Sequence, residues 1–104
     1  MDKLIVQLKV GKDTDFDQLI SIEEALIRKF MGDRTVEVDG HDIGEGRFNI
    51  YIHLSKGWEP ALATITETLD GLGLLPAAVV AKFHGETEQY EVVRPDSYSG
   101  PFTL

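Results

Sequence analysis

One glycine-rich stretch, residues 39–46 (DGHDIGEG), gathers side chains that could bind a metal ion or take part in catalysis. Its candidate binding residues are Asp39, His41, Asp42 and Glu45. A calcium loop needs oxygen ligands at alternating positions and a glutamate at the twelfth, a spacing that this stretch lacks. A phosphate-binding loop needs a lysine and a following helix, whereas a strand pattern follows here. Because both spacings fail, we interpret the stretch as the acidic connection of a β-hairpin, where Gly and Asp favour turns.

The histidines offer a second route to metal binding. A zinc ion needs about three converging protein ligands. His41 with Asp39 or Asp42 would meet that need if His53 or His84 joined them. Cysteine is absent, which excludes thiolate ligands, disulfides and cysteine nucleophiles. We predict neither a bound metal nor a cofactor, and the zinc set remains an alternative.

Further candidate binding residues follow in the strand pattern RFNIYIHL, residues 47–54. Alternation places Asn49, Tyr51 and His53 on one face, opposite the apolar residues. No catalytic residue is assigned, because the sequence has no G-x-S-x-G nucleophile elbow and no convincing acid and base pair. Trp58, the only tryptophan, is expected to pack under the sheet edge or at a helix start. If it were exposed, it would be a candidate contact for a partner.

Length and charge restrict the class of protein. The 104 residues suit a single domain, residues 1–104, with a core over about 3–95 and a C-terminal tail over 96–104. The tail either extends into solvent or folds back through Phe102. The formal charge is −8, from 18 carboxylates against 10 Lys and Arg, so binding to nucleic acid is not expected. The N-terminal segment predicts neither a signal peptide nor a membrane anchor, and we expect a cytoplasmic protein.

Hydrophobic periodicity predicts two helices and five strands. The helices fall within residues 13–32, where Asp15 is the expected N-cap, and 57–73, where Pro60 suits the first turn. The expected strands occupy residues 3–10, 34–38, 47–54, 77–83 and 90–93.

In this element order, βαββαββ, the chain resembles the ferredoxin-like superfold with a fifth strand added in a terminal hairpin. The resemblance covers about residues 3–93 and rests on element order. It implies an α+β two-layer sandwich with a mainly antiparallel five-stranded sheet. Right-handed crossovers would place both helices on one face of the sheet. The superfold hosts many activities and therefore implies no function alone.

Three functional hypotheses follow from these features. The leading one is a non-enzymatic, small acidic protein-interaction domain that serves as inhibitor or adaptor of a basic partner. The second is a ligand-sensing domain that forms a homodimer through the open sheet face, where Ile5, Gln7 and Lys9 would join the outward side chains of residues 47–54. The third is a small enzyme that uses His53 together with Tyr51 and Asn49.

Overall fold

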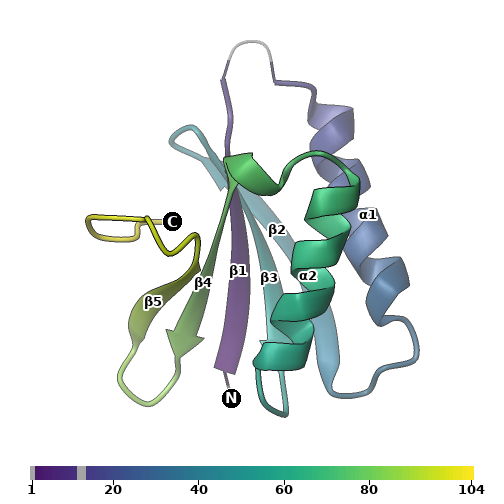
Figure 1. Ribbon diagram of the computed structural model, residues 1–104, viewed down its shortest axis with the longest axis vertical. Coiled ribbons are helices and arrows are strands. Elements are labelled where there is room, and N and C mark those ends of the chain that lie inside the picture. Colours follow the sequence, from purple (N-terminus) through teal and green to yellow (C-terminus); the bar gives the residue numbers. More distant parts are fainter. Residues whose placement is uncertain (1, 12–13) are drawn as a thin grey trace.

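The computed structural model describes residues 2–11 and 14–104, and it shows a two-layer α+β sandwich (Figure 1). The expected fold class and element order are confirmed; residue 13, placed in the first expected helix stretch, lies outside the described residues. A short 3₁₀ turn was not expected. The elements are β1 (Asp2–Lys9), α1 (Phe16–Phe30), β2 (Val36–Gly44), β3 (Arg47–Leu54), α2 (Glu59–Gly71), η1 (Leu75–Ala77), β4 (Ala78–His84) and β5 (Gln89–Arg94).

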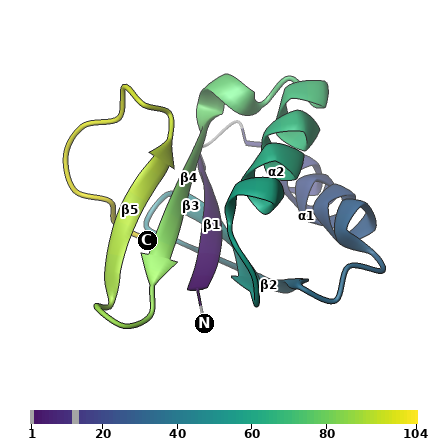
Figure 2. The ribbon, with the colours of Figure 1, turned by 60° about the horizontal axis from the view of Figure 1, so that its bottom comes forward.

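The sheet has the strand order β2-β3-β1-β4-β5, and every strand pair in it is antiparallel. β1 lies at the centre between β3 and β4, and β2 and β5 form the two edges. Both helices cover the same face of the sheet (Figures 1 and 2). Neither helix of the described chain is both long and apolar enough to cross a membrane.

The main core lies between the helices and the sheet. Val6 of β1 and Ile50 of β3 are fully buried there, together with Leu26 of α1 and Ile65 of α2. Burying one such side chain contributes roughly 1.5–3 kcal/mol. This core therefore fixes the helices over the central strands and leaves β2 at the margin.

The helix boundaries follow the expected local signals. Asp15 is the N-cap of α1, because its Oδ1 accepts a hydrogen bond from the Asp17 amide at 3.0 Å. Gly32, with φ of 88°, follows the C-cap residue Met31 and permits the left-handed turn that ends the helix. Pro60 lies in the first turn of α2, where a missing amide proton costs little.

The hairpin between β2 and β3 is tighter than expected. The expected connection over residues 39–46 is wrong in length, because β2 continues through Gly44 and only Glu45 and Gly46 form the turn. Both turn residues have positive φ, 50° and 77°, as a two-residue type I′ turn requires. β2 and β3 are therefore paired through most of the acidic stretch.

A β-bulge interrupts the pairing of β2 with β3 between Val38 and Gly40. Gly40 has φ of 120°, a conformation that favours glycine. The extra residue changes which side chains face the helices, because side chains alternate along a strand. After the bulge, His41 faces α1 and Asp42 faces the opposite side of the sheet.

The C-terminal tail, residues 96–104, loops away from β5 and returns to the sheet (Figures 1 and 2). The Phe102 ring lies 5.5 Å from the Tyr90 ring, measured between centroids. The carbonyl oxygen of Thr103 accepts a hydrogen bond from Gln7 Nε2 at 2.8 Å. Of the two alternatives for the tail, the structure therefore shows the fold-back through Phe102.

Candidate functional site

The edge strand β2 carries a run of exposed carboxylates. Glu37, Asp39 and Asp42 lie on the strand, Glu45 follows in the turn, and residues 36–46 contain no lysine or arginine. An edge strand presents backbone N–H and C=O groups that have no partner strand. β2 therefore combines a free hydrogen-bonding edge with negative charge.

An exposed apolar stripe of α1 lies beside this edge. Glu23 Oε2 is 2.9 Å from His41 Nδ1, which shows the side of α1 that faces β2. Helical spacing places Phe16 and Ile27 on the same side as Glu23, and they are 49% and 43% exposed. Met31, one turn after Ile27, is 76% exposed. The β2–α1 surface is defined as two sets together: the carboxylates Glu37, Asp39, Asp42 and Glu45, and the exposed apolar residues Phe16 and Ile27 of α1 with Met31 at its C-cap.

A hydrogen-bond network crosses the opposite face of the sheet from β2 to β1. Asp42 accepts hydrogen bonds from Tyr51 Oη at 2.7 Å and from Asn49 Nδ2 at 3.0 Å. Asn49 Oδ1 accepts from Gln7 Nε2 at 2.9 Å, and the same Gln7 nitrogen donates to the Thr103 carbonyl. Two of the expected candidates, Asn49 and Tyr51, thus donate hydrogen bonds to a third, Asp42, and Asn49 is also linked to the tail through Gln7.

Tyr51 is a hydrogen-bond donor in this network. Burial raises the pKa of its phenol, and the hydrogen bond to Asp42 raises the pKa further, because a nearby carboxylate disfavours the phenolate. The phenol therefore stays protonated at neutral pH. This protonation state suits Tyr51 as a hydrogen-bond donor that orients the Asp42 carboxylate.

His53 forms a separate pair with Asp39. Its Nε2 lies 3.0 Å from Asp39 Oδ2 at the surface. The hollow beside His53 measures about 90 Å³, whereas small-molecule sites occupy roughly 300–1,000 Å³. An imidazole oriented by a carboxylate is a familiar part of acid–base catalysis, but here it has little room for a substrate beside it.

The residues of the alternative zinc set do not converge. His41 faces the helices, where its ring centroid lies 5.1 Å from that of Phe48, while Asp42 and His53 lie on the other face of the sheet. His84 is on β4, three strands away from β2. Within residues 2–11 and 14–104, no three His, Asp or Glu side chains are grouped so as to hold a metal ion.

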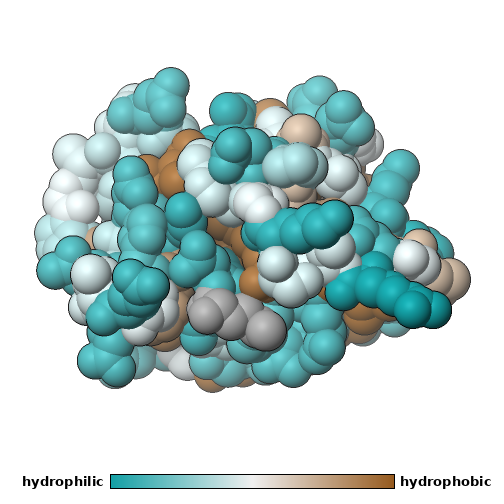
Figure 3. All heavy atoms as spheres, turned by 90° about the horizontal axis from the view of Figure 1, so that it is seen from below, coloured by the Kyte–Doolittle hydropathy of each residue, from teal (hydrophilic) through white to brown (hydrophobic). Residues whose placement is uncertain are grey.

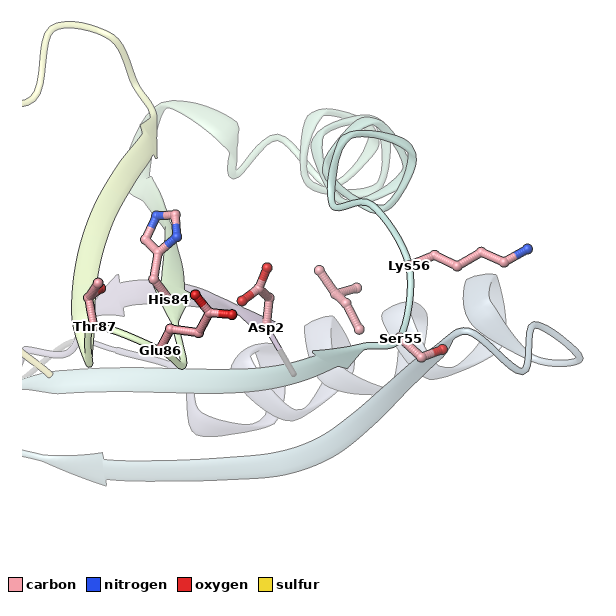
Figure 4. A pocket seen from close by; sticks show the side chains of 7 residues that line it. Asp2, Ser55, Lys56, His84, Glu86 and Thr87 are labelled. Atoms are coloured by element: carbon pink, nitrogen blue, oxygen red, sulfur yellow. The ribbon is translucent and has the colours of Figure 1, made fainter.

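A hollow of about 610 Å³ opens at the end of the sheet where β1 begins (Figures 3 and 4). Hydrophilic side chains surround hydrophobic atoms at this end of the molecule (Figure 3). Asp2, His84 and Glu86 lie together on one side of the hollow, whereas Ser55 and Lys56 point away from them (Figure 4). This arrangement does not place the Ser55 hydroxyl for activation by the imidazole. The lining residues are Asp2, Leu54, Ser55, Lys56, His84, Glu86 and Thr87.

Trp58 occupies a packing position, as the sequence suggested. It precedes α2 and packs against the main core. Lys82 Nζ lies 5.1 Å from the centroid of its ring, and the same ammonium group lies 3.9 Å from Asp2 Oδ2. The tryptophan therefore links α2 to β4 through a cation–π contact, and it is not part of the β2–α1 surface.

The β2–α1 surface is the candidate site with the clearest physical character. A segment paired with the free edge of β2 would meet carboxylates on the sheet face away from the helices and exposed apolar side chains on the α1 side. No family model, curated protein or solved structure matches this chain. The density of carboxylates in the sequence indicates the acidic half of this surface, whereas helical periodicity does not show which apolar residues of α1 stay exposed.

Proposed function

We propose that this chain is a non-enzymatic protein-interaction domain that binds a basic partner, as an inhibitor or adaptor, through the β2–α1 surface. The observation that supports the proposal is the position of an acidic edge strand directly beside an exposed apolar stripe. The partner contributes an extended segment that adds to β2 as a further strand. Main-chain hydrogen bonds supply affinity in this mode, and side chains on alternate positions supply specificity.

Charge favours a basic segment over a second copy of this chain. Pairing β2 with the β2 of another copy would bring the carboxylates of both strands together, and opposed like charges are destabilising. Asp42 is held by two neutral donors, Asn49 and Tyr51, so these contacts leave its negative charge uncompensated. Lysine or arginine side chains on an added strand would supply the missing positive charge and speed association.

The apolar stripe gives the partner an anchor beyond charge. Ile27 on the last turns of α1 and Met31 at its C-cap are exposed, although burying their apolar side chains away from water would be favourable. Methionine is unbranched and adapts its shape to different apolar surfaces. We therefore expect the bound segment to place at least one apolar side chain against α1.

A labelled probe peptide of alternating valine and lysine tests the proposal by fluorescence anisotropy. The dissociation constant should rise with sodium chloride, because salt screens the attraction between exposed charges. Glu37→Lys should weaken binding roughly 10-fold, the scale of one well-placed charge contact. Glu67→Lys is the matched control, because Glu67 is an exposed residue of α2. Ile27→Asp should also weaken binding, with exposed Ala63 of α2 as the site of the control substitution Ala63→Asp.

Three results would contradict the proposal. Binding that is insensitive to salt, or equally weakened by Glu37→Lys and Glu67→Lys, would show that the β2 charges do not select the partner. If the probe fails to bind at millimolar concentration, the carboxylates and the bulge of β2 serve to protect an edge strand against self-association.

A further inference from the structure

Several side chains on the sheet face opposite the helices are as buried as the main core. Ile5 and Ala81 have no exposed surface, and Asn49 and Gln7 are only 2% and 8% exposed. Ile5 and Ala81 are cross-strand neighbours on β1 and β4 and lie outside the cluster packed against the helices. This face is therefore a second, smaller packed region, to which the tail contributes.

The tail is held by one aromatic side chain and two backbone oxygens. The Phe102 ring packs on Tyr90, whose own ring lies 5.0 Å from Phe83. The Thr103 carbonyl accepts from the nearly buried amide of Gln7 at 2.8 Å. One residue further, the backbone oxygen of Leu104 lies 3.4 Å from an Arg47 guanidinium nitrogen.

The partners of the tail are positioned by the sheet itself. Gln7 Nε2 is oriented by Asn49 Oδ1, and Asn49 is oriented in turn by Asp42. The aromatic platform of Phe83 and Tyr90 spans paired positions of β4 and β5. A donor and an aromatic surface fixed in this way by neighbours form a preorganised site, which lowers the entropy lost on binding.

The contacts do not depend on most side chains of the tail. Thr103 offers its backbone oxygen while its side chain is exposed, and residues 99–101 are exposed as well. The tail has no helix or strand of its own. A different extended segment with an aromatic residue at the right position would satisfy the same groups.

We propose that the sheet face beneath the tail is a peptide-binding site, which residues 101–104 occupy within the chain. Its ligand from another protein is an extended segment that carries an aromatic side chain for Tyr90, followed by backbone carbonyls for Gln7 and Arg47. Attachment to the chain gives the tail a local concentration on the millimolar scale. Free tails of second copies therefore compete poorly at ordinary protein concentrations, whereas a segment with additional contacts displaces the tail.

The test uses the full chain and a fluorescein-labelled peptide with the sequence of residues 99–104 (SGPFTL). The wild-type protein should bind the peptide weakly, because its own tail competes. Phe102→Ala removes the aromatic anchor of the tail and should tighten binding of the peptide at least ~10-fold, given the competition from an attached ligand. Thr103→Ala is the control, since it keeps the backbone oxygen, and should bind like the wild type.

A second variant shows where the peptide binds. Gln7→Leu in the Phe102→Ala background should abolish the increase in peptide affinity. A peptide with alanine in place of its phenylalanine should not bind either protein. Near-ultraviolet circular dichroism of Trp58 reports whether each variant keeps its fold. Equal binding by the wild type and Phe102→Ala, or binding that survives Gln7→Leu, overturns the proposal. A wild-type dimer that dissociates when peptide is added would overturn the choice of a foreign segment and assign the face to a second copy.

Discussion

His41 Nδ1 lies 2.9 Å from Glu23 Oε2, and this contact ties the edge strand β2 to α1. The contact depends on the bulge between Val38 and Gly40. With uninterrupted alternation, Val38 and residue 40 would face the helices, and His41 would face the other way. One inserted residue thus places His41 beside α1 and, at the same time, delivers Asp42 to the network on the opposite face.

The first prediction concerns the strength of this contact. The two side chains are 31% and 13% exposed, so solvent screens the pair in part. A double-mutant cycle with Glu23→Gln and His41→Asn should give a coupling free energy of about 0.5–1 kcal/mol at neutral pH. Urea unfolding of the four proteins measures it. A coupling near zero would mean that packing alone holds β2 against α1.

The second prediction tests the bulge. Gly40→Ala should lower the free energy of unfolding by about 1 kcal/mol or more, because an alanine is strained at a φ of 120°. Space is not the cause, since a Cβ at this position would meet no atom within 4 Å. Gly44→Ala is the matched control on the same strand, where the Cβ is equally free and φ is not positive. If Gly40→Ala and Gly44→Ala lower the free energy of unfolding by similar amounts, the backbone conformation of Gly40 does not strain an alanine.

The third prediction concerns the turn between β2 and β3. Glu45 has φ of 50°, a conformation that asparagine tolerates better than glutamate, and Gly46 already follows it. Glu45→Asn should therefore raise the free energy of unfolding by about 0.5–1 kcal/mol, on the scale of compatible turn substitutions. Glu45→Gln removes the same charge without the conformational gain. If both variants are stabilised equally, loss of acidic repulsion is the cause.

Local patterns predicted most of the fold. Strict alternation in β3 and the capping signals at Asp15 and Pro60 mark elements whose sequence agrees with their final environment. The acidic stretch was mistaken for a connection because its composition favours turns, while its strand form depends on pairing with β3. Tertiary pairing overrides such a weak local preference.

The two proposed binding surfaces were less predictable than the fold, for physical reasons. On α1, apolar residues cover a wider arc than the core can bury, and periodicity alone does not show that Ile27 and Met31 remain exposed. The tail contacts involve backbone oxygens of Thr103 and Leu104, which carry no side-chain signal in a sequence. Only the register of the folded sheet brings Gln7 to meet them.

The last prediction follows from the raised pKa of Tyr51. Its unfolded-state pKa is close to the ordinary value of 10, and the folded-state pKa is higher. The folded protein therefore holds this proton more tightly, so the stabilisation is complete below about pH 10 and declines as the pH rises above it. Tyr51→Phe should show a shallower loss of stability in urea unfolding above pH 10. In a spectroscopic titration of tyrosinate, the substitution should remove a tyrosine that ionises above the ordinary pKa of 10. If Tyr51→Phe instead removes a tyrosine that ionises near pH 10, burial and the Asp42 hydrogen bond do not raise the pKa of Tyr51.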